Sequence, residues 1–289
     1  MQLSASELIL NPDRSIYHLN LQPEDLADTI ITVGDPDRVA AVSKHFDQIQ
    51  VRKGRREFIT HTGLLNNRRL TVVSTGIGTD NIDIVLNELD ALANIDFSSR
   101  KVKQEKRVLT LVRVGTSGAI QPQIPLDSFV ISEFAIGFDG LLHFYKHPPS
   151  LHADIEEAFI EQMNWQEEKS RPYVLAADTG LLEQLGSVSM IRGFTGTNTG
   201  FYGPQGRRLR LEPRNTDLSG KLAGFEFKGL KITNLEMETS GIYALASLMG
   251  HKAVSLNCIV ANRASGIFSK APGKAVDALI RYALEKLAL

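Results

Sequence analysis

Residues 108–120, VLTLVRVGTSGAI, indicate the fold class of this chain. Val108 to Val114 is an almost wholly aliphatic run, typical of a strand buried on both faces of a parallel sheet. The run stops at Gly115-Thr116-Ser117-Gly118, where backbone N–H groups and two hydroxyls can turn toward an anion. Arg113 stands inside the run, and an unpaired charge there is costly. Two interpretations follow: an oxyanion site at the end of a core strand, or a structural arginine paired with a carboxylate beside a simple turn.

The amino-acid composition of the chain limits which partners and which cellular compartment we expect for it. The chain has 289 residues, 43% of them hydrophobic, and its 32 basic and 33 acidic side chains nearly cancel. A polyanion or a membrane surface is therefore not an expected partner. A single cysteine, Cys258, fits a reducing compartment and excludes both an intrachain disulfide and a cysteine-based metal site. The N-terminus lacks a secretory pattern and no stretch of about 18 apolar residues occurs, so we expect a cytoplasmic protein.

Strand-like and helical patterns alternate along the whole chain, which predicts an α/β protein with a three-layer architecture. No repeat, linker or compositional break appears, so we expect one domain over residues 1–289. Residues 98–107 are polar and basic, and we expect an exposed loop there. Strands are expected at 29–33, 57–62, 69–74, 108–114, 127–134, 173–177, 190–195, 232–235 and 253–261. Helices are expected at 36–46, 78–92, 153–163, 239–249 and 276–289.

The stretch Thr195 to Arg207, TGTNTGFYGPQGR, is rich in hydroxyls, glycines and aromatic rings. The amide of Gln205 offers both a donor and an acceptor, and the guanidinium of Arg207 offers donors only. Together they suit the imide edge of a flat heterocycle, with Phe201 as a stacking surface. The alternative is a surface loop that its two aromatic residues anchor to the core.

Glu236-Met237-Glu238 lies at a predicted strand-to-helix junction. A carboxylate there suits vicinal ribose hydroxyls, and methionine can pack on a sugar face. Two carboxylates also occur as glycoside hydrolase pairs. We favour one structural or water-positioning acid and one sugar ligand. The simplest alternative is a pair of acids that the helix dipole stabilises in the first turn.

Other common site patterns are missing from the sequence. Ser74 to Asn81 begins like a dinucleotide fingerprint but has Asn81 at its third glycine position. The seven histidines form no HxH or HExxH pattern, so no metal site is predicted. The stretch Val114 to Gly118 misses the GxSxG pattern of a serine hydrolase by one position.

Several separated motifs together resemble the nucleoside phosphorylases of the uridine phosphorylase type, from about Tyr17 to the last helix. They are Tyr17-His18-Leu19, Gly34-Asp35-Pro36-Asp37-Arg38-Val39, Arg56-Glu57-Phe58, Ser74-Thr75-Gly76-Ile77-Gly78, Arg113 through Gln121, Phe201 through Arg207, Glu236-Met237-Glu238 and Asn262-Arg263.

This resemblance implies a single-domain three-layer αβα sandwich with a twisted mixed sheet. It also implies cleavage of a pyrimidine nucleoside, such as uridine, by inorganic phosphate as co-substrate, with no cofactor. The expected assembly is a homo-oligomer, a dimer or a trimer of dimers, with shared active sites. No nucleic acid or membrane partner is implied.

The resemblance also assigns roles to residues. Phosphate is expected at Gly34, Arg38, Arg113 and Thr116, with Arg56 from a neighbouring subunit. Ribose is expected at Met237 and Glu238, with His18 from the neighbour at the 5′-hydroxyl. The base is expected at Phe201, Gln205, Arg207 and Arg263. The residues expected to be catalytic are Arg113, Arg207 and Gln205.

Two regions bear on the substrate. Purine-type members carry an aspartate after the last strand, whereas residues 259–265 here read IVANRAS, with no acid, which favours a pyrimidine. Residues 208–231 depart from the family pattern, so the base preference is less firmly implied than the reaction. A nucleosidase of the same fold and a nucleoside-binding protein without turnover are the alternatives. The arginine group argues against the first, because water needs no such clamp.

Overall fold

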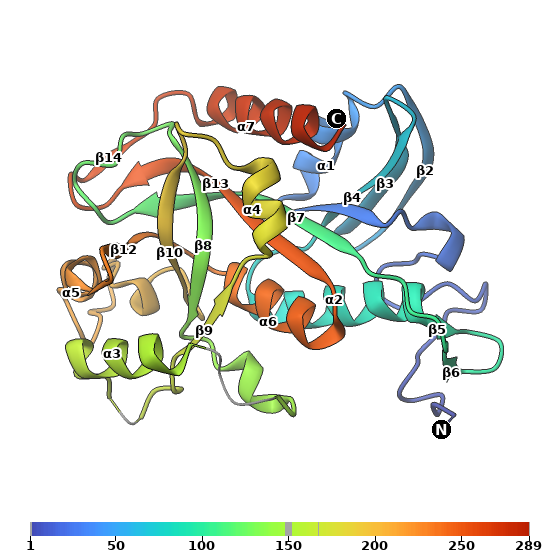
Figure 1. The fold of residues 1–289 in the computed structure, drawn as a ribbon, viewed down its shortest axis with the longest axis horizontal. Helices are drawn as coiled ribbons and strands as arrows, with labels where there is room; N and C mark the ends of the chain where they lie inside the picture. The colour runs from blue at the N-terminus through green and yellow to red at the C-terminus, as the bar shows by residue number, and fades with distance from the viewer. Residues whose placement is uncertain (1, 148–151, 167, 289) are drawn as a thin grey trace.

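A twisted sheet of twelve strands crosses the part of the chain that the structure, a computed structural model, describes: residues 2–147, 152–166 and 168–288 (Figure 1). Ten strands follow the order β11-β12-β10-β8-β13-β7-β1-β4-β3-β2, while β14 pairs with β13 and β9 with β8. The sheet strands are β1 Thr29–Val33, β2 Gln48–Arg55, β3 Phe58–Leu65, β4 Arg68–Ser74, β7 Thr110–Ala119, β8 Phe129–Gly137, β9 Tyr173–Ala176, β10 Ile191–Thr197, β11 Glu226–Phe227, β12 Leu230–Glu236, β13 Lys252–Asn262 and β14 Ile267–Phe268.

Helices cover both faces of this sheet, so the predicted three-layer α/β fold is confirmed. The helices are α1 Pro36–Ser43, α2 Thr79–Asn94, α3 Ala153–Met163, α4 Thr179–Leu185, α5 Leu218–Gly224, α6 Thr239–Met249 and α7 Pro272–Leu287. In Figure 1, α7 lies above the strands and α2 and α6 lie below them. α7 packs on β13 and β7, and α6 packs on β13, β8 and β10 from the other side.

The strand β7 is central, as its aliphatic pattern predicts. It pairs in parallel with β1 on one side and with β13 on the other. Our expectation that it stops at Gly115 is wrong, because β7 continues to Ala119. Its second half gains another partner, β12, which runs antiparallel through Gly118 and Ala119. Small residues at this end let the strand bend between two partners instead of forming a loop.

Local sequence explains how the main helices begin. Pro36 opens α1, as expected, and the carboxylate of Asp35 caps it by accepting a hydrogen bond from the Asp37 amide at 3.0 Å. Gly78, with φ of 95°, turns the chain into α2. α3 and α6 have the predicted bounds.

Other boundaries differ from the expectations. α1 ends at Ser43 instead of reaching Phe46. Strand β2 was not expected, because its sequence QIQVRKGR lacks an apolar run and alternates between exposed and partly buried residues. The basic stretch 98–107 includes one strand of a small hairpin, β5 Ile95–Asp96 with β6 Lys101–Val102, and is otherwise an irregular, largely exposed connection.

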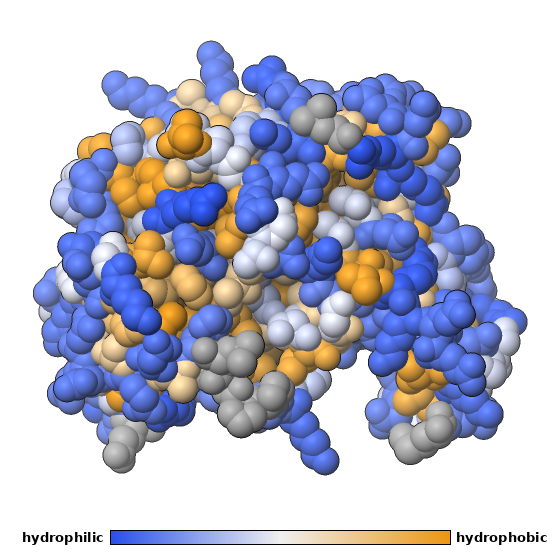
Figure 2. Space-filling model, viewed as in Figure 1, coloured by the Kyte–Doolittle hydropathy of each residue, from blue (hydrophilic) through white to orange (hydrophobic). Residues whose placement is uncertain are grey.

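Hydrophilic side chains cover much of the face in Figure 2, and hydrophobic ones gather at the upper left, over β14, β8 and β10. Ile267 and Phe268 of β14 are more than half exposed. None of the described helices combines the length and the apolar character needed to cross a bilayer.

Candidate active site

A cavity of about 790 Å³ opens where several strands of the sheet end. Gly34 follows β1, Gly76 follows β4 and Met237 follows β12, while β7 and β13 contribute their last residues. The carboxyl ends of parallel strands are a common place for a ligand site in open α/β sheets. Of the residues predicted to bind substrate, the cavity is lined by Gly34, Arg38, Arg113, Thr116, Phe201, Gln205, Arg207, Met237 and Glu238.

All four phosphate residues predicted from this chain's own subunit meet on one side of the cavity. Arg38 lies in the first turn of α1, and its Nη1 is 3.5 Å from the carbonyl oxygen of Val114 in β7. Burial lowers the pKa of Arg38, and the nearby Asp35 carboxylate opposes this effect. A charged guanidinium that is already partly stripped of water suits an oxyanion ligand.

Arg113 is buried, and two carboxylates surround its guanidinium. Its Nη2 lies 2.6 Å from Glu238 Oε2 and 3.1 Å from Glu236 Oε2. Although burial lowers the pKa of Arg113, the two carboxylates outweigh it and the pKa is raised. The structure therefore confirms that Arg113 is paired with carboxylates, and it places the same residue in the lining of the cavity, so that the oxyanion site stays a prediction.

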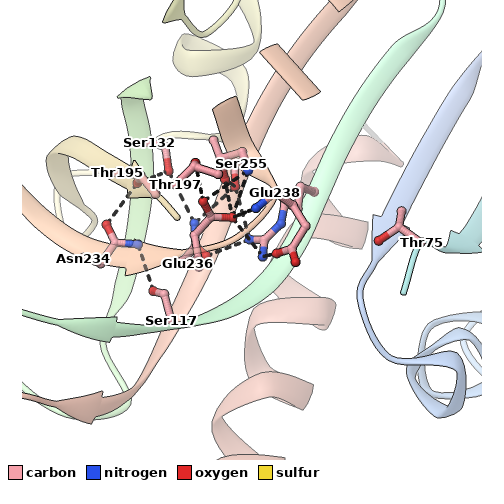
Figure 3. Close-up of polar contacts among 12 residues, drawn as sticks. Thr75, Ser117, Ser132, Thr195, Thr197, Asn234, Glu236, Glu238 and Ser255 are labelled. Atoms are coloured by element: carbon pink, nitrogen blue, oxygen red, sulfur yellow. Dashed lines mark hydrogen bonds and ion pairs between the residues drawn. The ribbon is translucent and has the colours of Figure 1, made fainter. Parts of the chain in front are cut away.

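A buried chain of hydrogen-bonded polar side chains leads away from this arginine, and Figure 3 shows its members Ser132, Thr195, Asn234 and Ser117. Arg113 Nη1 donates to Asn257 Oδ1 at 2.7 Å, and Asn257 Nδ2 donates to Ser132 Oγ at 3.3 Å. The chain then passes through Thr195 and Asn234 and ends at Ser117, which lines the cavity beside Thr116. The network thus begins and ends on β7, with every link between buried groups. Sequence reasoning missed Asn257, because a lone amide in an apolar strand does not reveal its partner.

Gly115 is required by the position of Arg113. The guanidinium folds over this glycine so closely that an added Cβ would lie 2.1 Å from Arg113 Nη1. Any larger residue would push the guanidinium away from its carboxylate partners. Gly115 therefore allows the Arg113 guanidinium to approach the backbone closely, and it does not end the strand.

The two acids of Glu236-Met237-Glu238 have different surroundings. Glu236 accepts hydrogen bonds from Thr197 Oγ1 and from the backbone N–H groups of Glu238 and Thr239, which hold its carboxylate in place. Glu238 accepts from the Gly78 amide at 2.8 Å and from Arg113. Burial raises the pKa of Glu238, as does the neighbouring Glu236, whereas Arg113 opposes them.

Three of the four residues predicted to bind the base, Phe201, Gln205 and Arg207, line the cavity and lie in the loop after β10. Gln205 is 1% exposed, and its side-chain oxygen accepts a hydrogen bond from Arg207. The Arg207 guanidinium lies 3.8 Å from the centroid of the half-exposed Phe201 ring. Burial, helped by the positive charge of Arg263, lowers the pKa of Arg207 to about 10. Arg263 itself donates to the Gln205 carbonyl, so it supports the loop from outside the lining.

His18 and Arg56 are not among the residues that line this cavity. The ring of His18 packs edge-on against Phe58, 6.4 Å between centroids, and Arg56 is exposed in the adjacent turn between β2 and β3. His18 Nδ1 lies 2.7 Å from Glu88 Oε1. The two predicted neighbour-subunit residues thus lie near Phe58 and outside the lining of their own cavity, although Glu57 beside Arg56 belongs to that lining.

Comparisons with known proteins agree with this geometry. The family model described as "Phosphorylase superfamily" matches residues 28–287. The uridine phosphorylase of Thermococcus kodakarensis is 28% identical over 281 residues, covering 94% of this chain and 86% of the relative. The uridine phosphorylase of Escherichia coli is 27% identical, with 86% of each chain covered. The solved structure of a Trypanosoma brucei nucleoside phosphorylase, described as showing uridine phosphorylase activity, superposes with a TM-score of 0.87 at 28% identity, covering 97% of this chain and 99% of that one.

Proposed function

The chain belongs to the phosphorylase superfamily, and from this we propose that it cleaves a pyrimidine nucleoside, uridine first, with inorganic phosphate. The products are the free base and ribose 1-phosphate. One observation carries the proposal: a single cavity holds an arginine pair for an oxyanion, a carboxylate for ribose hydroxyls and an amide–guanidinium pair for a base.

The reaction breaks the bond between ribose C1′ and the base nitrogen, and the electron pair leaves with the base. A phosphate oxygen forms the new bond to C1′. Positive charge develops on the sugar, and negative charge develops on the departing base. Phosphate held at Arg38 and Arg113 stabilises the positive charge on the sugar. Arg207, with Gln205, stabilises the negative charge on the departing base without a proton transfer.

Glu238 is proposed to accept the ribose hydroxyls, with Met237 against the sugar. Glu238 Oε2 also binds Arg113 at 2.6 Å. A ribose that draws Glu238 toward its hydroxyls releases part of the Arg113 guanidinium for phosphate. The nucleoside and phosphate subsites are thereby coupled through one carboxylate.

We propose that the active enzyme is a homo-oligomer with shared sites. His18 and Arg56 are expected to complete the partner's cavity, because both lie outside the lining of their own. We also propose that the enzyme works in the cytoplasm with no cofactor, metal, nucleic acid or membrane partner. The single cysteine supports the cytoplasmic location. The balanced charge supports the absence of a nucleic acid or membrane partner.

Uracil release from uridine, followed with and without inorganic phosphate, tests the proposed reaction. Thymidine and inosine in parallel test the preference for a pyrimidine. The missing acid in residues 259–265 favours the pyrimidine, and Asn262 at that place is committed to backbone groups of the same chain.

A further inference from the structure

A second cleft, of about 500 Å³, lies behind the base-binding loop. One wall is formed by Asn198, Thr199, Gly203 and Pro204 of that loop, and another by Trp165, Gln166, Lys169 and Ser170. The third wall belongs to residues 214–222, within the segment that departs from the family pattern. The cleft shares no lining residue with the 790 Å³ cavity.

Three cations line this cleft: Lys169 on one wall, and Arg214 and Lys221 together on another. Neither lysine forms an ion pair with any described residue, whereas Arg214 Nη2 lies 3.8 Å from Glu168 Oε1. Burial lowers the pKa of Lys169, and the positive charges of Arg214 and Lys221 lower it further. The three charges are thus close enough to repel one another, and a bound anion would relieve that repulsion.

The acids around the cleft do not neutralise these cations. Asp139 lines the cleft, but its carboxylate accepts from Tyr173 Oη and Ser240 Oγ, both at 2.7 Å, and from the Leu141 amide. Glu168 is the acid that contacts one of the cations, and its side chain is 68% exposed. Among the residues that line the cleft, three cations thus stand against one carboxylate, that of Asp139.

The floor is aromatic and the remaining walls offer amides. Trp165 stacks on Phe138 with 5.1 Å between ring centroids, and Lys169 Nζ lies 4.6 Å from the indole centroid. The side chains of Gln166, Asn198 and Asn215 also line the cleft. An apolar floor weakens the competition of water for the cations, and a planar guanidinium matches two phosphate oxygens at once.

We propose that this cleft binds the phosphate chain of a polyphosphorylated anion, at a site separate from the catalytic cavity. The cations stand on two walls of a cleft of about 500 Å³, which has room for a chain of phosphates that contacts both walls. The ligand would touch Asn198 and Pro204, in the same loop as Gln205 and Arg207. It would therefore bind beside the loop that holds the base.

The test is calorimetric titration of the full-length protein with inorganic tripolyphosphate and, in parallel, with adenosine triphosphate. Saturating orthophosphate is present throughout, so that the catalytic phosphate site is occupied. The test variant is Lys169→Ala with Lys221→Ala. The matched control is Lys228→Ala with Lys231→Ala, which removes the same charge from exposed lysines paired with Asp154 and Glu226 outside the cleft.

We expect one additional site in the wild-type protein and an affinity at least about tenfold weaker in the test variant. The control should bind as the wild type does. Equal affinity for both probes supports recognition of the phosphate chain alone, and tighter binding of the nucleotide supports an added contribution from Trp165. Absence of binding or equal loss in both variants would overturn the proposal, as would a probe affinity that falls in proportion when the orthophosphate concentration is raised further. Because the readout is binding, it is independent of whether uridine is cleaved.

Discussion

Glu238 Oε2 lies 2.6 Å from Arg113 Nη2, so the residue expected to hold ribose touches the residue expected to hold phosphate. Both side chains are buried, at 8% and 6% exposure. Neither can be changed without altering the electrostatics of the other, because a buried charge that loses its partner pays its full desolvation cost. This pair is the centre of the proposed site.

Arg113→Lys should lower kcat/KM for uridine roughly 10²–10³-fold, the loss typical of one preorganised donor at a developing charge. Lysine keeps the positive charge between Glu236 and Glu238 but loses the two-pronged geometry that also reaches Asn257. Steady-state kinetics with a melting curve measures this. Arg281→Lys, on the exposed face of α7, is the control, and equal activity of the two variants would argue against the assignment.

Glu238→Gln should raise the KM for uridine about tenfold or more, because a hydrogen bond to a charged acceptor contributes roughly 1.5–3 kcal/mol. It should also make phosphate binding at least as tight as in the wild type, since the carboxylate that competes for Arg113 is gone. Separate titrations with phosphate alone and with uridine alone distinguish the two effects. Weaker binding of phosphate alone would contradict the coupling.

Asn257→Leu should mainly raise the KM for phosphate, by about tenfold, because it leaves Arg113 Nη1 without its 2.7 Å acceptor. If the substitution only lowered the stability of the protein, the KM for phosphate would not rise more than the KM for uridine. Thr62→Val is the matched control, because it removes a buried hydrogen bond of 2.8 Å to Thr71, far from the cavity lining. A uniform fall in kcat for both variants, with no change in either KM, would mean that Asn257 is only structural.

Arg207→Ala should lower kcat for uridine about 10²-fold or more through loss of charge stabilisation on the departing base. A uridine with an electron-withdrawing fluorine on the base should suffer a smaller loss, because its base carries negative charge more easily. Pre-steady-state rates of base release for the two nucleosides provide the comparison. Equal losses for the two nucleosides would mean that Arg207 contributes to binding of the substrate and does not stabilise the charge on the departing base.

Arg56→Ala and Arg207→Ala should each be poorly active, yet a mixture refolded together should regain activity. A mixed pair of subunits contains one site with Arg207 from one chain and Arg56 from the other. In a random two-fold dimer about a quarter of all sites would then be intact. No recovery on mixing, with oligomers present, would mean that a site does not combine Arg207 of one subunit with Arg56 of the other.

The sequence predicts the α/β architecture well, because buried parallel strands and helical stripes leave clear hydrophobic patterns. β1 and the helices α3 and α6 have the expected bounds. Strand β2 escapes prediction because it is an edge strand with no apolar run. The continuation of β7 past Gly115 escapes it because glycine usually marks the end of a strand, whereas here it makes room for Arg113.

The residues that line the cavity are predictable where they directly follow a strand, as do Gly34 and Met237. The residues that hold the cavity-lining side chains in place are not predictable in the same way. Asn257 lies 144 residues from Arg113, and nothing in the sequence links them until β13 pairs with β7. The part played by His18 and Arg56 depends on a second subunit, so their roles stay a prediction.

The most direct test of the account is uracil release by the purified protein from uridine, measured in phosphate-free buffer and again with added orthophosphate. The account predicts release that requires phosphate and forms one ribose 1-phosphate for each uracil. Equal release without phosphate would contradict it, because water would then be the attacking group and the arginines at the cavity would serve another purpose.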